Sequence, residues 1–231
     1  MSNILICDDE KDIVSALRIC LAAEGYEIFE AYNGMEALNV IRQNDIHLVL
    51  LDIMMPEMDG ISTLAKIRES YNMPVLFISA KSEDADKILG LNIGADDYIT
   101  KPFNIIEVVA RVKSNLRRYM RLGSNVSGSS RIEIGGLCLD DSEKTVTADG
   151  KEINLTPTEY EILKLLMKNP GKVFSPREIY EKVWKETLLG SENTVAVHIR
   201  HLREKLEINP AEPRYIKVVW GQGYKIQGVG R

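Results

Sequence analysis

The sequence predicts an α/β domain with a five-stranded, doubly wound parallel sheet, followed by a smaller α+β domain. Three observations lead to this prediction. Short apolar runs alternate with helical patterns as far as residue 121, small polar residues fill positions 122–130, and short broken segments begin at residue 131. We therefore expect two domains, 1–121 and 131–231, with a flexible linker between them at 122–130.

The strands of the first domain are expected in five short segments that are apolar throughout, as strands buried on both faces of a parallel sheet are. They are residues 4–7, 26–29, 48–51, 75–78 and 98–99. Between them, apolar residues recur at helical spacing, as Ile13, Leu17 and Leu21 do. A chain in which strands and helices alternate in this way builds a doubly wound sheet.

The second domain has the element order of a winged helix. Residues 131–155 alternate in polarity and are broken by Gly-Gly, Asp-Asp and Asp-Gly, which indicates an antiparallel meander. Helices are expected to begin after Thr156 and Ser175, because each is followed by proline and, three residues on, by glutamate. A third helix is expected at about 192–206 and a hairpin at 215–226.

Charge and composition bound the location and the partners. The net charge is −6 over residues 1–121 and +1 over the rest, which suggests two units with different partners. No apolar run approaches the ~20 residues of a membrane span, and the acidic N-terminus is unlike a signal peptide. We therefore expect a cytoplasmic protein without a membrane partner. The cysteines Cys7, Cys20 and Cys138 lack the short spacing of a zinc site and are expected to be buried thiols in a reducing compartment.

Polar side chains follow four of the predicted strands: Asp8 and Asp9, then Asp52, Ser79 and Lys101. In a doubly wound sheet these positions converge at the carboxyl edge, where ligands bind. Three clustered carboxylates stay ionised together only beside a cation, and oxygen ligands favour Mg²⁺. A metal and a lysine beside one carboxylate suit phosphoryl transfer to that carboxylate. Asp52 stands alone, which suits a nucleophile, whereas the adjacent Asp8 and Asp9 suit the metal. Taken singly, each residue could instead be a helix cap or part of a turn.

Residues 1–121 resemble the receiver domain of two-component response regulators, whose fold is flavodoxin- or CheY-like. The segments ICDDE, LLDIMMPEMDG, ISAKS and GADDYITKPF carry the resemblance. It implies that Asp52 accepts a phosphoryl group from a sensor histidine kinase, and that Ser79 and Lys101 then hold this group. The implied Mg²⁺ ligands are Asp8, Asp9, Asp52 and the backbone carbonyl of Met54. The resemblance also implies a cis Lys101–Pro102 bond and a switch role for Tyr98, which by itself could be an ordinary strand aromatic.

Within the OmpR/PhoB subfamily, the resemblance implies a homodimer that forms on phosphorylation. Three charged pairs would cross its symmetric interface: Lys87 with Glu107, Asp97 with Arg111, and Asp96 with Arg118. Leu91 and Ala110 match its small apolar centre. On the residues alone, these charges could be an ordinary solvated surface. Because exposed pairs contribute only ~0–1 kcal/mol each, their expected role is to set register and partner choice.

The third helix of the second domain is the candidate DNA-reading element. Its apolar stripe consists of Val195, Ile199, Leu202 and Leu206. Val197 stands at the centre of the opposite, polar face, where it could contact a thymine methyl group, although the helix could instead dock on another protein. The pair His198 and His201 is not an obvious metal site, because no acidic partner is evident nearby.

Residues 131–231 resemble the OmpR/PhoB effector domain in LTPTEYEILKLL, NTVAVHIRHLREKL and VVWGQGYKI. The resemblance implies sequence-specific binding to double-stranded promoter DNA and makes residues 184–191 a candidate contact for RNA polymerase. The expected DNA contacts are Asn193, Thr194, Val197, Arg200, His201, Arg203, Lys205, Arg214 and Lys225. Trp220 stands where the family's wing often has arginine. With VVWGQGYK and GADDYITKPF, the chain looks most like the vancomycin-resistance type of regulator.

The expected function is therefore that of a phosphorylation-dependent transcriptional regulator in a two-component system, not of an enzyme beyond its own phosphotransfer and slow dephosphorylation. Two other classes stay open. A Mg²⁺-dependent phosphohydrolase with an aspartyl-phosphate intermediate would explain the acids but leave the winged helix without a role. A constitutive DNA-binding protein would bind DNA equally well with and without a phosphoryl mimic.

Overall fold

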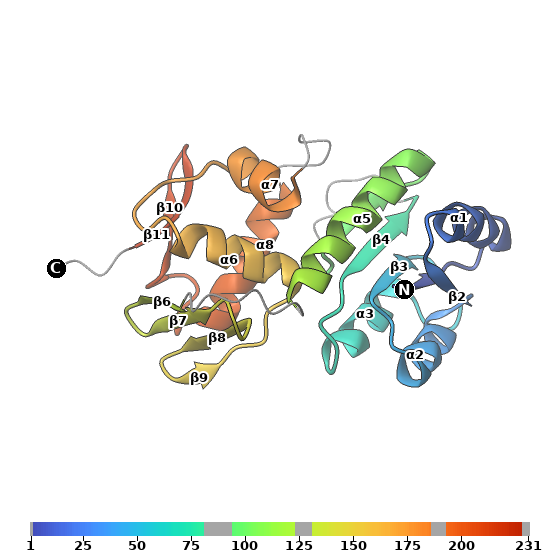
Figure 1. The fold of residues 1–231 in the computed structure, drawn as a ribbon, viewed down its shortest axis with the longest axis horizontal. Helices are drawn as coiled ribbons and strands as arrows, with labels where there is room; N and C mark the ends of the chain where they lie inside the picture. Colours follow the sequence, from blue (N-terminus) through green and yellow to red (C-terminus); the bar gives the residue numbers. More distant parts are fainter. Residues whose placement is uncertain (1, 81–93, 123–130, 186–192, 228–231) are drawn as a thin grey trace. The chain divides into compact units, whose positions relative to one another are not determined.

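The chain forms two compact units, residues 1–119 and 120–231 (Figure 1). The structure, a computed structural model, describes residues 2–80, 94–122, 131–185 and 193–227. Several residues for which the sequence makes a prediction lie outside this described part of the chain. They are Lys87, Leu91, the linker residues 123–130, and residues 186–191 of the candidate polymerase contact.

In the first unit, five strands form one parallel sheet in the order β2-β1-β3-β4-β5. The strands are β1 (Asn3–Cys7), β2 (Glu27–Ala31), β3 (Leu48–Asp52), β4 (Val75–Ser79) and β5 (Asp97–Thr100). Every residue of β3 and β4 is buried, which explains why these runs are apolar along almost their whole length. The predicted doubly wound sheet is confirmed, and its topological switch point falls between β1 and β3.

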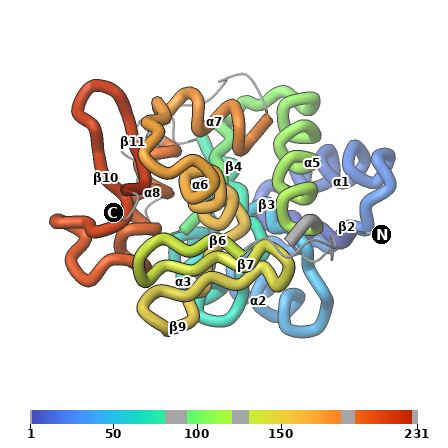
Figure 2. Tube along the Cα trace, turned by 60° about the vertical axis from the view of Figure 1, so that its left-hand side comes forward, coloured from blue at the N-terminus to red at the C-terminus, as the bar shows by residue number. Residues whose placement is uncertain are grey.

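Four helices are described in this unit: α1 (Lys11–Ala23), α2 (Gly34–Gln43), α3 (Gly60–Arg68) and α5 (Ile105–Leu122). Helices α1 and α5 bury their apolar stripes in one core cluster with the sheet, and α2 packs against α3 (Figure 2). The side chains of Asn33 and Asp59 cap α2 and α3 by accepting a backbone hydrogen bond. Leu122, expected to open the linker, instead ends α5.

The second unit begins with an antiparallel sheet of β6 (Arg131–Ile134), β7 (Leu137–Asp140), β8 (Thr145–Ala148) and β9 (Lys151–Glu152). Three helices follow, α6 (Pro157–Met167), α7 (Pro176–Trp184) and α8 (Asn193–Leu206), and then the hairpin β10 (Ile216–Val219) and β11 (Gly223–Ile226). The predicted capping boxes are present in α6 and α7. The winged-helix order of elements is thus confirmed (Figures 1 and 2).

Several hydrogen bonds attach the hairpin β10–β11, the wing, to the rest of the unit. Phe174 and Tyr224 exchange backbone hydrogen bonds of 2.9 Å, and this close approach requires glycine at position 223, where a Cβ would lie 2.0 Å from the Phe174 carbonyl oxygen. Arg203 on α8 donates to the Ile216 carbonyl from Nε and Nη2, at 3.1 and 2.9 Å. Helix α8 and the residues before α7 therefore fix the position of the wing.

The cysteines differ in burial from the expectation. Cys7 is buried, but Cys20 and Cys138 are only half-buried. Burial raises the pKa of the Cys7 thiol, and the neighbouring carboxylates raise it further, so this thiol stays protonated at neutral pH. Cys7 is therefore a packing residue beneath the acidic edge of the sheet.

Candidate functional sites

The polar residues predicted at the strand ends meet at one edge of the parallel sheet. Asp8 follows β1 and Lys101 follows β5, whereas Asp52 and Ser79 are the last residues of β3 and β4. These strands run parallel and are neighbours in the order β1-β3-β4-β5, so their carboxyl ends lie side by side. Convergence thus follows from the topology of the sheet.

Lys101 stands among three acids. Its Nζ lies 2.8 Å from Asp8 Oδ2, 3.0 Å from Glu10 Oε1 and 3.6 Å from Asp52 Oδ1. Burial acts to lower the pKa of Lys101, but the hydrogen bonds to Asp8 and Glu10 outweigh it, and the pKa is raised. The group is therefore a fixed positive charge beside Asp52. Glu10 was not among the predicted site residues, and its place next to Asp8 and Asp9 in ICDDE was the only signal for it.

The two carboxylate oxygens of the buried residue Asp52 have different partners. Its Oδ2 accepts a hydrogen bond from the Met54 N–H at 3.1 Å, and its Oδ1 faces Lys101. Only 4% of the residue is exposed. Burial raises the pKa of Asp52 to about 6 against the opposing effect of Lys101. The pKa of Asp8 is also raised by burial, despite its hydrogen bond to Lys101. Further positive charge at this edge would stabilise both carboxylates.

Three of the carboxylates could share a metal ion. One oxygen from each of Asp8, Asp9 and Asp52 lies within 4.8 Å of the others. Asp8 and Asp52 are buried and Asp9 is exposed, so the cluster is open to water on one side. A donor set of oxygens with room for water fits Mg²⁺, which retains several waters when it binds proteins. The backbone of Met54 lies beside the cluster through its hydrogen bond to Asp52.

The remaining predicted residues of this edge lie on β4 and β5. Ser79 is fully buried, and its carbonyl accepts a hydrogen bond from the Lys101 N–H at 2.8 Å. The Tyr98 ring is buried, with its centroid 6.5 Å from that of Phe77. The Lys101–Pro102 peptide bond is cis, as expected. A backbone hydrogen bond therefore connects Ser79, at the end of β4, directly to Lys101, which follows β5.

The described charged residues of the expected dimer face have partners within their own chain. Asp97 pairs with Arg111 at 2.8 Å, and Arg111 also pairs with Glu107 at 2.9 Å. Asp96 is buried and pairs with Arg68 at 2.9 Å, a contact that the sequence did not indicate. Arg118 donates to Ser114 and Asn115, and Ala110 is exposed. Pairing of these charges between subunits stays a prediction.

The expected DNA contacts differ in exposure. Arg200 and Lys205 are exposed on α8 and pair with Glu204 and Glu159, at 2.8 and 2.7 Å. Thr194, Val197 and His201 are buried. The guanidinium of Arg203 binds the wing, and Arg214 is exposed and pairs with Asp149. Lys225 on β11 is half-buried, and the side chain of Asn193 is not described. A side chain reads a base only where it reaches the groove, so the individual contacts stay predictions.

One expectation about α8 was wrong. The sequence shows no acidic partner near the histidine pair, but Glu159, at the start of α6, lies 3.7 Å from His201, measured from Oε1 to Nδ1. The two residues are far apart in sequence, and only the packing of α6 against α8 brings them together.

The fold is that of a response regulator with a C-terminal DNA-binding domain. Residues 4–113 match the family model of the response regulator receiver domain, and residues 150–226 match that of the C-terminal domain of transcriptional regulatory proteins. The regulatory proteins VanRc of Enterococcus gallinarum and VanR of Enterococcus faecium are 45% and 42% identical over 227 residues, which cover 97% of this chain and 98% of each relative.

A solved structure shows the same architecture. The response regulator DrrB, an OmpR/PhoB homologue of Thermotoga maritima, is 33% identical, with a TM-score of 0.52 over 99% of this chain and 100% of that chain. The chain therefore belongs to the OmpR/PhoB family of response regulators and is a transcriptional regulator of the two-component type. Among the described helices, none combines the length and apolarity that crossing a membrane requires.

Proposed function

We propose that Asp52 accepts a phosphoryl group from a sensor histidine kinase in the cytoplasm, and that this modification controls the binding of residues 131–231 to promoter DNA. The observation that carries the proposal is the position of Lys101, whose ammonium lies between Asp8, Glu10 and the buried Asp52. A fixed cation beside a buried carboxylate suits the added negative charge of an acyl phosphate.

The two oxygens of Asp52 would take different parts in the transfer. Oδ2 is held by the Met54 N–H, and Oδ1 faces Lys101. We assign Oδ1 as the nucleophile: it forms the bond to phosphorus as the bond from phosphorus to the donor nitrogen breaks. Lys101 and the Ser79 hydroxyl would then bind oxygens of the phosphoryl group. Mg²⁺, held by Asp8, Asp9, Asp52 and the Met54 carbonyl, would neutralise the charge that the transferred group brings.

The change at Ser79 would reach the dimer face through β4 and β5. Tyr98 lies on β5 between Asp97, which pairs with Arg111, and the segment that leads to Lys101. Dimerisation through Lys87, Leu91, Asp96, Asp97, Glu107, Ala110, Arg111 and Arg118 would place two winged helices on neighbouring half-sites. Linking two DNA-binding modules raises their effective concentration and hence their avidity without any new base contact. The segment 184–191, whose first residue Trp184 is buried, would include the contact for RNA polymerase.

The proposal is tested by mapping DNA occupancy with the full-length protein before and after treatment with Mg²⁺ and an acyl-phosphate donor. Treatment should increase occupancy at a limited set of promoters for the natural protein and for Asp45→Asn, a control that removes an exposed carboxylate just before β3. It should leave Asp52→Asn unchanged. Equal occupancy by all three proteins in both states would contradict control by Asp52 and would indicate constitutive binding.

A further inference from the structure

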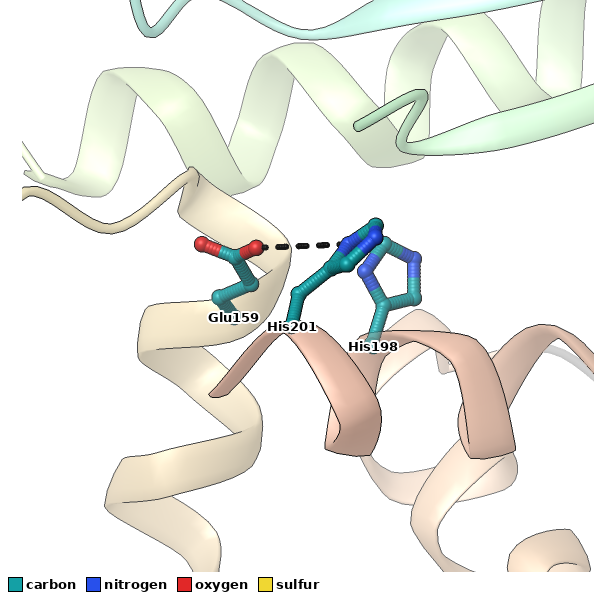
Figure 3. A group of neighbouring side chains, drawn as sticks. All are labelled: Glu159, His198 and His201. Atoms are coloured by element: carbon teal, nitrogen blue, oxygen red, sulfur yellow. Dashed lines mark ion pairs between the residues drawn. The ribbon is translucent and has the colours of Figure 1, made fainter. Parts of the chain in front are cut away.

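A second group of side chains that can ligate a metal lies within the winged-helix unit (Figure 3). Glu159 comes from the first turn of α6, and His198 and His201 come from α8. Each offers one ligand atom, these atoms lie within 4.8 Å of one another, and all three residues are buried. The spacing of three residues places both imidazoles on one face of α8.

The donor set indicates the class of ion. Two imidazoles and one carboxylate suit Zn²⁺ and other late divalent transition metals, whereas Mg²⁺ prefers a set of oxygens. We infer that Glu159, His198 and His201 form a binding site for a divalent transition-metal ion such as Zn²⁺. Three protein ligands leave a fourth position for water in a tetrahedral ion.

Glu159 can bind an ion without leaving its structural role, because its two oxygens face different partners. Oε2 accepts hydrogen bonds from the Thr156 N–H at 2.8 Å and from the Lys205 ammonium at 2.7 Å. Oε1 lies on the side of His201, 3.7 Å from Nδ1 (Figure 3). The capping box of α6 would therefore persist when Oε1 takes the metal. Lys205 opposes the ion by its charge and limits the affinity of the site.

The histidines are held by the packing of the unit. The His198 ring lies 5.7 Å from the Trp184 ring, and Trp184 in turn stacks on Tyr180. Ligand atoms of a tetrahedral ion with bonds of ~2.0 Å lie ~3.3 Å apart, so binding would draw the three side chains together by ~1.5 Å at most. The ion would thereby link α6 to α8. If α8 is the recognition helix of the proposed function, DNA binding would respond to the metal; the site itself does not depend on that proposal.

The test uses full-length protein in excess Mg²⁺, which occupies the acids of the sheet edge. Zn²⁺ is titrated by calorimetry, and Co²⁺ replaces it for visible spectroscopy. We expect one ion per chain and the intense visible bands of four-coordinate Co²⁺. Glu159→Gln, which retains the cap, and His201→Gln should each weaken Zn²⁺ binding by at least ~10-fold, because even the loss of a residue that only supports a ligand has an effect of that size.

Two matched controls separate the site from general effects. Glu178→Gln changes the same capping position of α7, where no histidine pair is found, and His47→Gln removes the remaining histidine of the chain. Neither should alter binding. Lys205→Gln should strengthen it, a gain that unfolding cannot produce. Absence of a 1:1 complex, or equal affinity of the natural protein, Glu159→Gln and His201→Gln, would overturn the inference.

Discussion

Replacing Asp52 with asparagine should stabilise the metal-free first unit at neutral pH, although it removes the proposed phosphoacceptor. The reason is electrostatic. Asp52 is buried, and its pKa is raised from 3.8 to about 6, so the ionised form is less stable in the fold than in the unfolded chain. Asparagine has nearly the same shape, carries no charge, and retains an oxygen that can accept the Met54 hydrogen bond.

The magnitude follows from the shift in pKa. One pKa unit corresponds to 1.36 kcal/mol, so the ionised side chain lowers the free energy of unfolding by about 3 kcal/mol above pH 6. Well below pH 3.8 the side chain is protonated in both states and the penalty is absent, and near pH 4 most of it is already lost. Because the folded-state pKa is the higher one, the stability of the natural protein falls relative to the variant as pH rises between about 4 and 6.

The assay is urea unfolding in EDTA, followed by far-UV circular dichroism at pH 4 and pH 7.5. Trp184 and Trp220, the two tryptophans, both lie in the second unit, so their fluorescence reports that unit separately and should not shift. Asp45→Asn, which changes an exposed acid, should match the natural protein at both pH values. The reasoning is refuted if Asp52→Asn gains nothing at pH 7.5, or if it gains as much at pH 4.

Three further predictions concern the metal, the dimer face and the wing. Asp9→Asn changes an exposed acid and should leave the metal-free fold intact, but it should reduce the rise in unfolding midpoint that millimolar Mg²⁺ gives the natural protein; an equal rise would exclude Asp9 as a ligand. Arg68→Met removes the guanidinium from buried Asp96 and should cost ~3 kcal/mol in urea unfolding. A cost below ~1 kcal/mol, the range of an exposed ion pair, would contradict this prediction. Arg203→Met removes two hydrogen bonds to the Ile216 carbonyl, should cost ~1–2 kcal/mol, and should speed amide exchange in β10 and β11; unchanged exchange would show that other contacts hold the wing.

Much of the fold could be predicted because its signals are local. Buried strands such as β3 and β4 are apolar runs, and the helices that begin at Pro157 and Pro176 have a complete capping box in sequence. The convergence of Asp8, Asp52 and Lys101 was also predictable, because all carboxyl ends of a parallel sheet share one edge. Each of these inferences requires only the local sequence around the residue and, for the site, the rule that parallel strands end at one edge of the sheet.

The contacts that sequence reasoning missed join residues far apart in the chain. Arg68 reaches Asp96 from α3, and Glu159 reaches His201 from another helix. Glu10 contacts Lys101, which lies 91 residues further along the chain. Such contacts depend on side-chain reach and on how two elements pack, neither of which appears as a period or a motif. The expectation that the α8 histidines lack an acidic neighbour failed for this reason.

The measurement that tests the central claim most directly is chemical detection of the phosphorylated residue. Purified protein is incubated with Mg²⁺ and a radiolabelled histidine-kinase donor or acyl phosphate, and the label is located by peptide mapping. The account predicts one acid-stable, base-labile group per chain on Asp52, and none on Asp52→Asn. A label that never forms, or that forms equally on Asp52→Asn, would contradict it.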